Sequence, residues 1–112
     1  MDTITWTDFE KIEMRVGTIL RAEDFPEARK PAYKLTIDFG NEVGMRKSSA
    51  QITTLYTKDN LIGRQVIAVV NFPPKQIGNF MSECLVLGTV GEAGEITLLQ
   101  PERSATNGLR IA

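Results

Sequence analysis

A stretch near the N-terminus alternates between two sets of side chains and constrains the fold more than any other part of the sequence. One face carries Ile12, Met14, Val16, Thr18 and Leu20, and the other carries Glu13, Arg15, Gly17, Ile19 and Arg21. A period of two is typical of a β-strand, because successive side chains point to opposite faces. Glycine inside a strand often marks a bulge or a bend. Gly17 therefore predicts a long strand that bends to serve two parts of a small closed barrel.

Strand patterns recur along the chain in a definite order. Alternation predicts strands over 34–39 and 45–51, and a pattern of the same kind over 82–88 predicts the last strand of the barrel. The run Val66–Val70 is continuously apolar and rich in β-branched residues, which predicts a central strand buried on both faces. The charged segment 23–33 contains two prolines and is expected to be a long loop.

Two helices complete the predicted pattern. The sequence Thr7-Asp8-Phe9-Glu10 fits a capping box, which predicts a short N-terminal helix. Ile52, Leu55 and Tyr56 lie at helical spacing, and Gly63 is a suitable stop signal. A second helix is therefore expected between the third and fourth strands.

This order of elements is that of an OB-fold, a five-stranded Greek-key barrel. We predict an all-β protein: a five-stranded OB-fold barrel with a helix between strands three and four, a short N-terminal helix and a C-terminal strand extension. Residues 1–112 are expected to form a single domain. Segment 93–112 exceeds what five strands require, and an additional apolar strand at 96–99 would leave an exposed edge. We expect this extension to mediate a homodimer.

Histidine is absent from the chain, which removes the commonest general base and the commonest metal ligand together. No phosphate-binding glycine motif, metal-spaced cluster or activated nucleophile is present, and Glu83 has no identifiable acidic partner. We therefore expect a non-catalytic protein without a cofactor or metal.

Other absences bear on where the protein works. The single cysteine, Cys84, cannot form an internal disulfide, and the N-terminus has no secretory signal. No apolar stretch has the length of a membrane span. These features predict a cytoplasmic location and no membrane insertion.

The third predicted strand is the first candidate binding surface. Because 13 basic residues nearly balance 14 acidic ones, a nucleic-acid site must be a local patch. Segment 46–51 places two cations beside two hydroxyls and an amide, on the strand that normally floors an OB-fold groove. Such groups contact phosphates and bases. A solvated edge strand would carry the same residues, and only one face of the strand can meet a ligand.

Two loops are further candidates. Segment 71–80 interleaves Phe72 and Phe80 with Lys75, so that the rings could stack on bases while the lysine holds phosphate. Alternatively, the two rings plug one end of the barrel. The first loop and the residues after it carry a second group of cations, which could equally be solvated without a ligand: Arg29, Lys30 and Lys34.

The run Asp8–Ile19 contains a phenylalanine followed by the sequence Glu-Met-Arg-Val-Gly. With further matches over 37–40, 69–75 and 82–83, it resembles the opening and body of the tRNA-binding domain family, which includes the C-terminal domain of many bacterial methionyl-tRNA synthetases. The resemblance implies a partner that is tRNA or tRNA-like RNA. The residues expected to bind it are Arg46, Lys47, Ser48, Ser49, Asn71, Lys75 and Ser82.

Segments 25–29, 48–52 and 98–101 also resemble stand-alone, homodimeric members of the family that act as chaperones in bacterial protein export. That resemblance implies binding of unfolded or export-destined polypeptides. The candidates for it are apolar side chains near the groove or the dimer contact: Phe39, Phe72, Ile77, Phe80 and Met81. The sequence does not rank RNA binding against polypeptide binding, and one dimer could do both.

Overall fold

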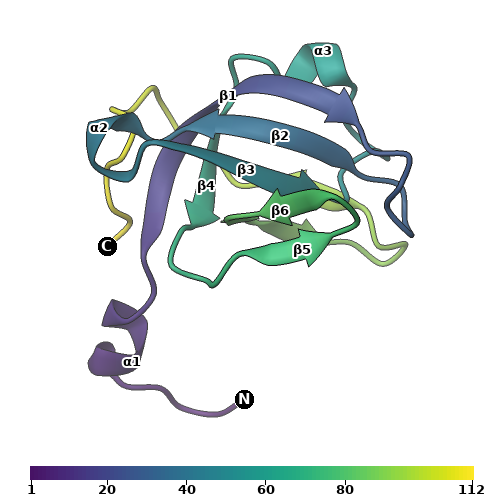
Figure 1. Cartoon of the computed structure of the whole chain (residues 1–112). Coiled ribbons are helices and arrows are strands. Elements are labelled where there is room, and N and C mark those ends of the chain that lie inside the picture. The colour runs from purple at the N-terminus through teal and green to yellow at the C-terminus, as the bar shows by residue number, and fades with distance from the viewer.

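A five-stranded antiparallel sheet, curled into a nearly closed barrel, forms the body of the computed structural model, which describes residues 1–112 (Figure 1). The strand order is β3-β2-β1-β4-β7, with the hairpins β5–β6 and β8–β9 as separate two-stranded sheets. The strands are β1 (Met14–Asp24), β2 (Tyr33–Asp38), β3 (Met45–Ala50), β4 (Gln65–Val69), β5 (Lys75–Ile77), β6 (Phe80–Ser82), β7 (Leu85–Val86), β8 (Gly88–Val90) and β9 (Ile96–Leu98). The helices are α1 (Trp6–Glu10), α2 (Gly40–Val43) and α3 (Lys58–Leu61). The predicted fold class is confirmed.

The long strand β1 organises the barrel because it pairs with different strands along its length. Its first half pairs with β4 and its second half with β2. β2 pairs in turn with β3 along its whole length. The other edge of β3 meets residues 82–84, where the amide of Glu83 donates to the carbonyl oxygen of Lys47 at 2.7 Å. The chain then returns through β7 to β4, which completes the circuit.

β1 contains a bulge, three residues beyond the glycine that predicted one. The register against β2 shifts between Ile19 and Arg21. Up to Leu20 the predicted alternation holds, with Ile19 fully buried and Leu20 44% exposed on the opposite face. Beyond the shift it fails, because Arg21, assigned to the face of Ile19, is exposed while Ala22 packs against the core. Gly17 has a different role. A Cβ at this position would lie 2.7 Å from the Phe39 ring, so the glycine allows β1 to pack closely on the core.

The barrel interior is a single cluster of 12 buried residues. Its members are Ile19, Leu35, Ile37, Phe39, Ala50, Ile52, Leu61, Val66, Ala68, Val70, Cys84 and Leu98. Leu61 is the one buried residue of α3, whose N-terminus is capped by Thr57 and Asn60. The helix predicted from the spacing of Ile52, Leu55 and Tyr56 is therefore wrong in extent, since only the segment Lys58–Leu61 is helical.

The C-terminal tail lies along the first half of β1, on the edge that β2 leaves free. Val16 donates to the carbonyl of Leu109 at 3.0 Å, Gly108 donates to the carbonyl of Val16 at 2.7 Å, and Ile111 donates to the carbonyl of Met14 at 2.9 Å. β9, which precedes the tail, pairs with β8 of the same chain. One edge of β9 is therefore paired within the chain, and the dimer contact expected at 93–112 stays a prediction.

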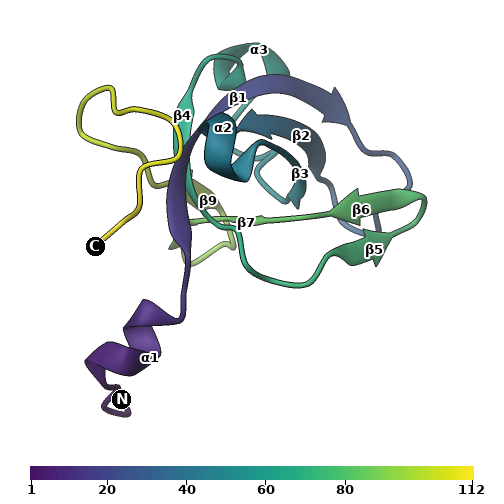
Figure 2. The ribbon, with the colours of Figure 1, turned by 60° about the vertical axis from the view of Figure 1, so that its left-hand side comes forward.

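The N-terminal arm, residues 1–12, projects from the barrel in both views (Figures 1 and 2). Its capping box is formed by Thr5 and Asp8, two residues earlier than predicted: Asp8 donates to the Thr5 hydroxyl at 3.1 Å, and Thr5 donates to the Asp8 carboxylate at 3.0 Å. α1 buries no side chain, and Trp6 is 85% exposed. None of the helices is both long and apolar enough to cross a membrane.

Candidate nucleic-acid interface

β3 lies beside the β5–β6 hairpin (Figure 1). Residues of both line a groove. One part has a volume of about 390 Å³ and carries Phe72 at one end. A second part, of about 480 Å³, continues toward the loop after β1. The two parts share Ser49, Gln51, Lys75 and Ile77, and the second adds Arg29 and Lys30. The groove is therefore polar in the middle, aromatic at one end and basic at the other.

β3 is fixed against the hairpin by hydrogen bonds that use side chains as well as backbone. The amide of Ser49 donates to the Ser82 hydroxyl at 3.1 Å, and the amide of Lys47 donates to the Glu83 carboxylate at 2.9 Å. Because side chains alternate along a strand, Lys47, Ser49 and Gln51 share one side of β3, and the last two line the groove. Glu83 thus satisfies a backbone donor at the strand edge.

Several cations at or beside the groove are unpaired. The ion pairs of the structure involve Lys11, Arg15, Arg21, Lys58, Arg103 and Arg110. None of them includes Arg29, Lys30, Lys47 or Lys75. Glu27 is the one acidic side chain among the residues lining the two parts. The groove therefore carries positive charge that the chain itself does not neutralise through ion pairs.

Two predicted binding residues lie inside the barrel, and these predictions are wrong. The Ser48 side chain is buried, and its hydroxyl donates to the carbonyl of Cys84 at 2.9 Å. Ser48 belongs to the face of β3 that points inward, together with Ala50. Phe39 is fully buried in the core immediately after β2, so it cannot contact a polypeptide.

Arg46 and Asn71, both expected to bind RNA, make contacts within the chain. The half-buried Arg46 donates to the carbonyl of Val70 at 3.3 Å. The Asn71 amide bonds to the base of the N-terminal arm rather than lining the groove. Of the RNA candidates, Ser49, Lys75 and Ser82 line the groove, and Lys47 lies on the same side of β3 as Ser49.

The remaining polypeptide candidates surround the groove in different ways. Phe72 is 54% exposed and lines it together with Ile77. Phe80 packs edge-to-face on the buried Phe25 with ring centroids 5.3 Å apart, which fits the alternative that an aromatic plugs the barrel end. Met81 is exposed on β6.

An apolar pocket of about 330 Å³ extends the groove beyond Ser49 and Gln51. Its other lining residues come from β3, β7, β8 and β9 and the segments between them: Ala50, Ile52, Leu85, Val86, Leu87, Gly88, Val90 and Ile96. The sequence does not predict this pocket, because Ala50 and Ile52 meet residues 85–96 only in the folded barrel. Polar and apolar binding surfaces are therefore continuous.

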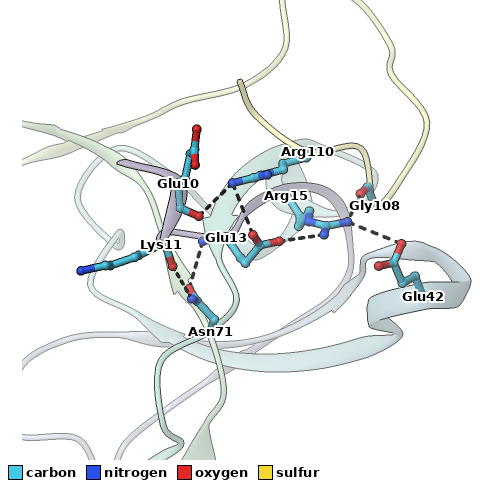
Figure 3. Close-up of polar contacts among 8 residues, drawn as sticks. All are labelled: Glu10, Lys11, Glu13, Arg15, Glu42, Asn71, Gly108 and Arg110. Carbon is cyan, nitrogen blue, oxygen red and sulfur yellow. Dashed lines mark hydrogen bonds and ion pairs between the residues drawn. The ribbon is translucent and has the colours of Figure 1, made fainter. Parts of the chain in front are cut away.

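A network of polar contacts lies at the base of the arm and includes none of the residues that line the groove (Figure 3). Arg15 bonds to the Glu13 carboxylate at 2.8 Å and to the carbonyl of Gly108 at 3.0 Å, and it lies 3.7 Å from Glu42. The hydrogen bond from Arg15 lowers the pKa of Glu13, and the same bond raises the pKa of Arg15. Arg15 Nε is buried without a partner. The network is occupied by contacts within the chain and presents no open site.

The Cys84 thiol is buried and has low reactivity. Burial raises the pKa of its thiol to about 11, so the reactive thiolate is scarce near neutral pH. No group of three or more Cys, Asp or Glu side chains is arranged to hold a metal ion.

Residues 14–110 match the family model described as "Putative tRNA binding domain". The chain belongs to the tRNA-binding domain family. Solved structures agree: the chaperone CsaA of Bacillus anthracis is 52% identical with a TM-score of 0.94, covering 99% of this chain and 100% of that one. The CsaA chaperone of Picrophilus torridus is 55% identical with a TM-score of 0.91, covering 98% and 100%. The predicted family and its CsaA-like fold are confirmed.

Curated relatives place the same domain in a larger protein. The methionine–tRNA ligase of Nitrosomonas eutropha is 37% identical over 110 residues, which is 98% of this chain and 15% of the relative. That of Thermococcus onnurineus is 32% identical over 111 residues, again 15% of the relative. The chain thus spans only a small part of these relatives.

Gln51, Arg29 and Lys30 line the groove of this tRNA-binding domain, although they were not among the residues expected to bind RNA. The place of Gln51 in the groove could be predicted from the sequence, because it lies on the same side of the chain as Lys47 and Ser49. The two cations follow an acidic stretch, which made a solvated loop the simpler interpretation. Only the fold brings them beside Lys75.

Proposed function

We propose that this chain is a non-catalytic cytoplasmic module that binds tRNA or a tRNA-like RNA in the groove between β3 and the β5–β6 hairpin. The observation that carries the proposal is the set of unpaired cations along the groove, in a chain whose other basic residues include several ion-paired ones. Unneutralised Lys and Arg side chains are what a phosphate backbone requires. Family membership supports the same ligand class.

Each groove residue has a role in this proposal. Lys47, Lys75 and the Arg29–Lys30 pair contact phosphates, while Ser49, Gln51 and Ser82 supply hydrogen bonds to sugars or bases. Phe72 is exposed at the end of the groove, where its ring can stack on an unpaired base. Structured RNA is recognised largely through its backbone and shape, which suits a groove with few base-reading groups.

Salt dependence tests the phosphate contacts. The affinity for a tRNA pool should fall steeply with added salt, and Lys47→Ala or Lys75→Ala should each flatten the slope by about one unit. Arg103→Ala is the matched control, because this exposed arginine pairs with Glu102 on the C-terminal loop. Affinity and slope that are unchanged in both lysine variants would refute the proposed groove.

Polypeptide binding in protein export is the second candidate, and the apolar pocket beside the groove favours it. Leu85 is 49% exposed and Val90 75% exposed at this pocket, and Phe72, Ile77 and Met81 continue the apolar surface. The solved relatives from Bacillus anthracis and Picrophilus torridus are chaperones. Because the hydrophobic effect is not screened by salt, an unfolded apolar peptide should bind as well or better when salt is added. Val90→Asp should weaken the peptide and leave tRNA binding unchanged.

A homodimer is part of the proposal, with the N-terminal arm as a contact together with the expected segment 93–112, whose last residue lies beside the arm. Trp6 and Ile4, 85% and 64% exposed, line an apolar depression with Phe9 and Ala112. A second copy would cover these side chains and remove their contact with water. Sedimentation velocity at micromolar concentration should show a dimer that Trp6→Ala dissociates. A wild-type protein that stays monomeric would contradict this assembly.

A further inference from the structure

Asn71 connects the N-terminal arm to the chain that forms the wall of the groove. Its amide nitrogen donates to the carbonyl of Lys11 at 2.7 Å, and its amide oxygen accepts from the backbone of Glu13 at 3.1 Å (Figure 3). The next two residues, Phe72 and Pro73, line the groove. One side chain therefore holds the arm on one side, and its own backbone leads directly into the groove on the other.

The arm has few other attachments. Within one protomer α1 buries no side chain, so its position in the monomer depends on polar contacts at its base rather than on the hydrophobic effect. Arg110 donates to the carbonyl of Glu10 at 3.0 Å, and the backbone amide of Val70 donates to the carbonyl of Glu13 at 2.9 Å. Breaking a few hydrogen bonds would release the arm without opening the barrel.

We propose that Asn71 is a positioning residue that couples the seating of the arm to ligand binding in the groove. A ligand that fixes Phe72 and Pro73 also fixes Asn71, and thereby holds the arm in place. Thermodynamic linkage makes this coupling reciprocal, so a seated arm strengthens ligand binding. The inference rests on the proposed tRNA-binding function, because it takes the groove as the ligand site.

The chain contains its own reporter for the arm. Trp6 is its one tryptophan, lies on α1, and is not among the residues lining the groove. Time-resolved anisotropy of Trp6, recorded at protein concentrations where no dimer forms while the full-length protein is titrated with an unlabelled tRNA pool, measures arm motion. A filter-binding assay on the same samples measures tRNA affinity separately.

In the wild type, tRNA binding should reduce the fast local motion of Trp6. In Asn71→Ala, tRNA should still bind through the cations, with affinity lowered by about fivefold or more, a typical coupling factor. The fast motion should then persist in the bound protein. Asn41→Ala, an exposed asparagine of α2 without a side-chain hydrogen bond, should behave as the wild type in both assays.

A second variant keeps the test valid if Asn71→Ala unfolds. Arg110→Lys preserves the positive charge but disturbs the hydrogen bond from Arg110 to the carbonyl of Glu10. This contact holds the arm without involving Asn71. It should also lower tRNA affinity, although Arg110 does not line the groove. An unchanged affinity in this variant would overturn the coupling.

The outcomes separate this inference from the function on which it rests. If tRNA binds the wild type and the Trp6 response is the same in Asn71→Ala, the coupling is wrong while the groove remains the RNA site. If tRNA does not bind the wild type even at low salt, the proposed function itself fails. A wild-type complex in which Trp6 motion does not change also overturns the coupling.

Discussion

The barrel and the N-terminal arm are held in place by different forces. The barrel encloses one apolar cluster in which side chains such as Phe39 and Leu61 are fully buried. The arm instead exposes Trp6 and Ile4 and is attached by hydrogen bonds at its base. Hydrophobic burial makes the barrel cooperative, whereas a segment with polar attachments opens at a low free energy. The two regions should therefore respond to different perturbations.

Removing a core ring should produce the largest effect. Phe39→Ala should lower the free energy of unfolding by about 3–5 kcal/mol, because it deletes a buried ring and leaves a cavity. Denaturant unfolding followed by circular dichroism measures this change. Phe72→Ala, at an exposed ring, should change stability by about 0.5 kcal/mol or less. Equal losses in the two variants would contradict the assignment of Phe39 to the core.

Alkaline pH should weaken the barrel through its buried thiol. Burial raises the pKa of Cys84 from 9.0 to about 11, so the folded state holds the proton more tightly than the unfolded state does. The free energy of unfolding should therefore fall as pH rises from about 9 to about 11, by up to about 1.4 kcal/mol per pH unit. Cys84→Ala should lack this component. Matching stability profiles for the two proteins over this range would show that the thiol does not contribute.

Acid should act on the arm. The hydrogen bond from Arg15, with the charge of Arg110, lowers the pKa of Glu13 below its ordinary value of 4.5. The carboxylate therefore contributes fully to the attachment of the arm above pH 4.5, and this contribution is lost as the pH falls through the lowered pKa. Trp6 anisotropy should fall in this acid range, while Glu13→Gln should already have a mobile arm at neutral pH. A variant that retains the wild-type acid response would mean that another group controls the arm.

Truncating the tryptophan should have the smallest effect on stability. Because Trp6 is exposed on a helix that buries no side chain, Trp6→Ala should change the free energy of unfolding of the monomer by about 0.5 kcal/mol or less. The measurement belongs at protein concentrations where no dimer forms. A substantial loss of monomer stability would mean that the arm packs on its own barrel, and the contrast between the two regions would fail.

Sequence reasoning succeeded where a pattern is local and failed where burial depends on distant residues. The run over 66–70 and the alternation over 45–51 located β4 and β3 to within a residue. The bulge after Ile19 depends on register against β2, which periodicity does not encode. Similarly, Ser48 resembled a surface hydroxyl until the fold placed it against the carbonyl of Cys84, 36 residues away.

The candidate site shows the same division. Lys75 and Ser49 lie on elements that the sequence identified, and both line the groove. Asn71 belonged to a loop of suitable composition, but its amide is engaged by the arm about 60 residues earlier in the chain. The composition of the sequence identified the segments that form the candidate site. Which side chains of those segments line the groove depends on tertiary contacts, which composition does not show.

The pairing of β1 with the C-terminal tail has a consequence for biosynthesis. The residues that occupy the free edge of Met14 and Val16 are Gly108, Leu109 and Ile111, so β1 is synthesised well before the residues that pair with it. Such non-local pairing slows folding and leaves a strand edge open during synthesis. Ribosome-bound chains that stop short of residue 108 should consequently be cleaved by protease within β1, and chains extended beyond residue 112 by a linker should be protected.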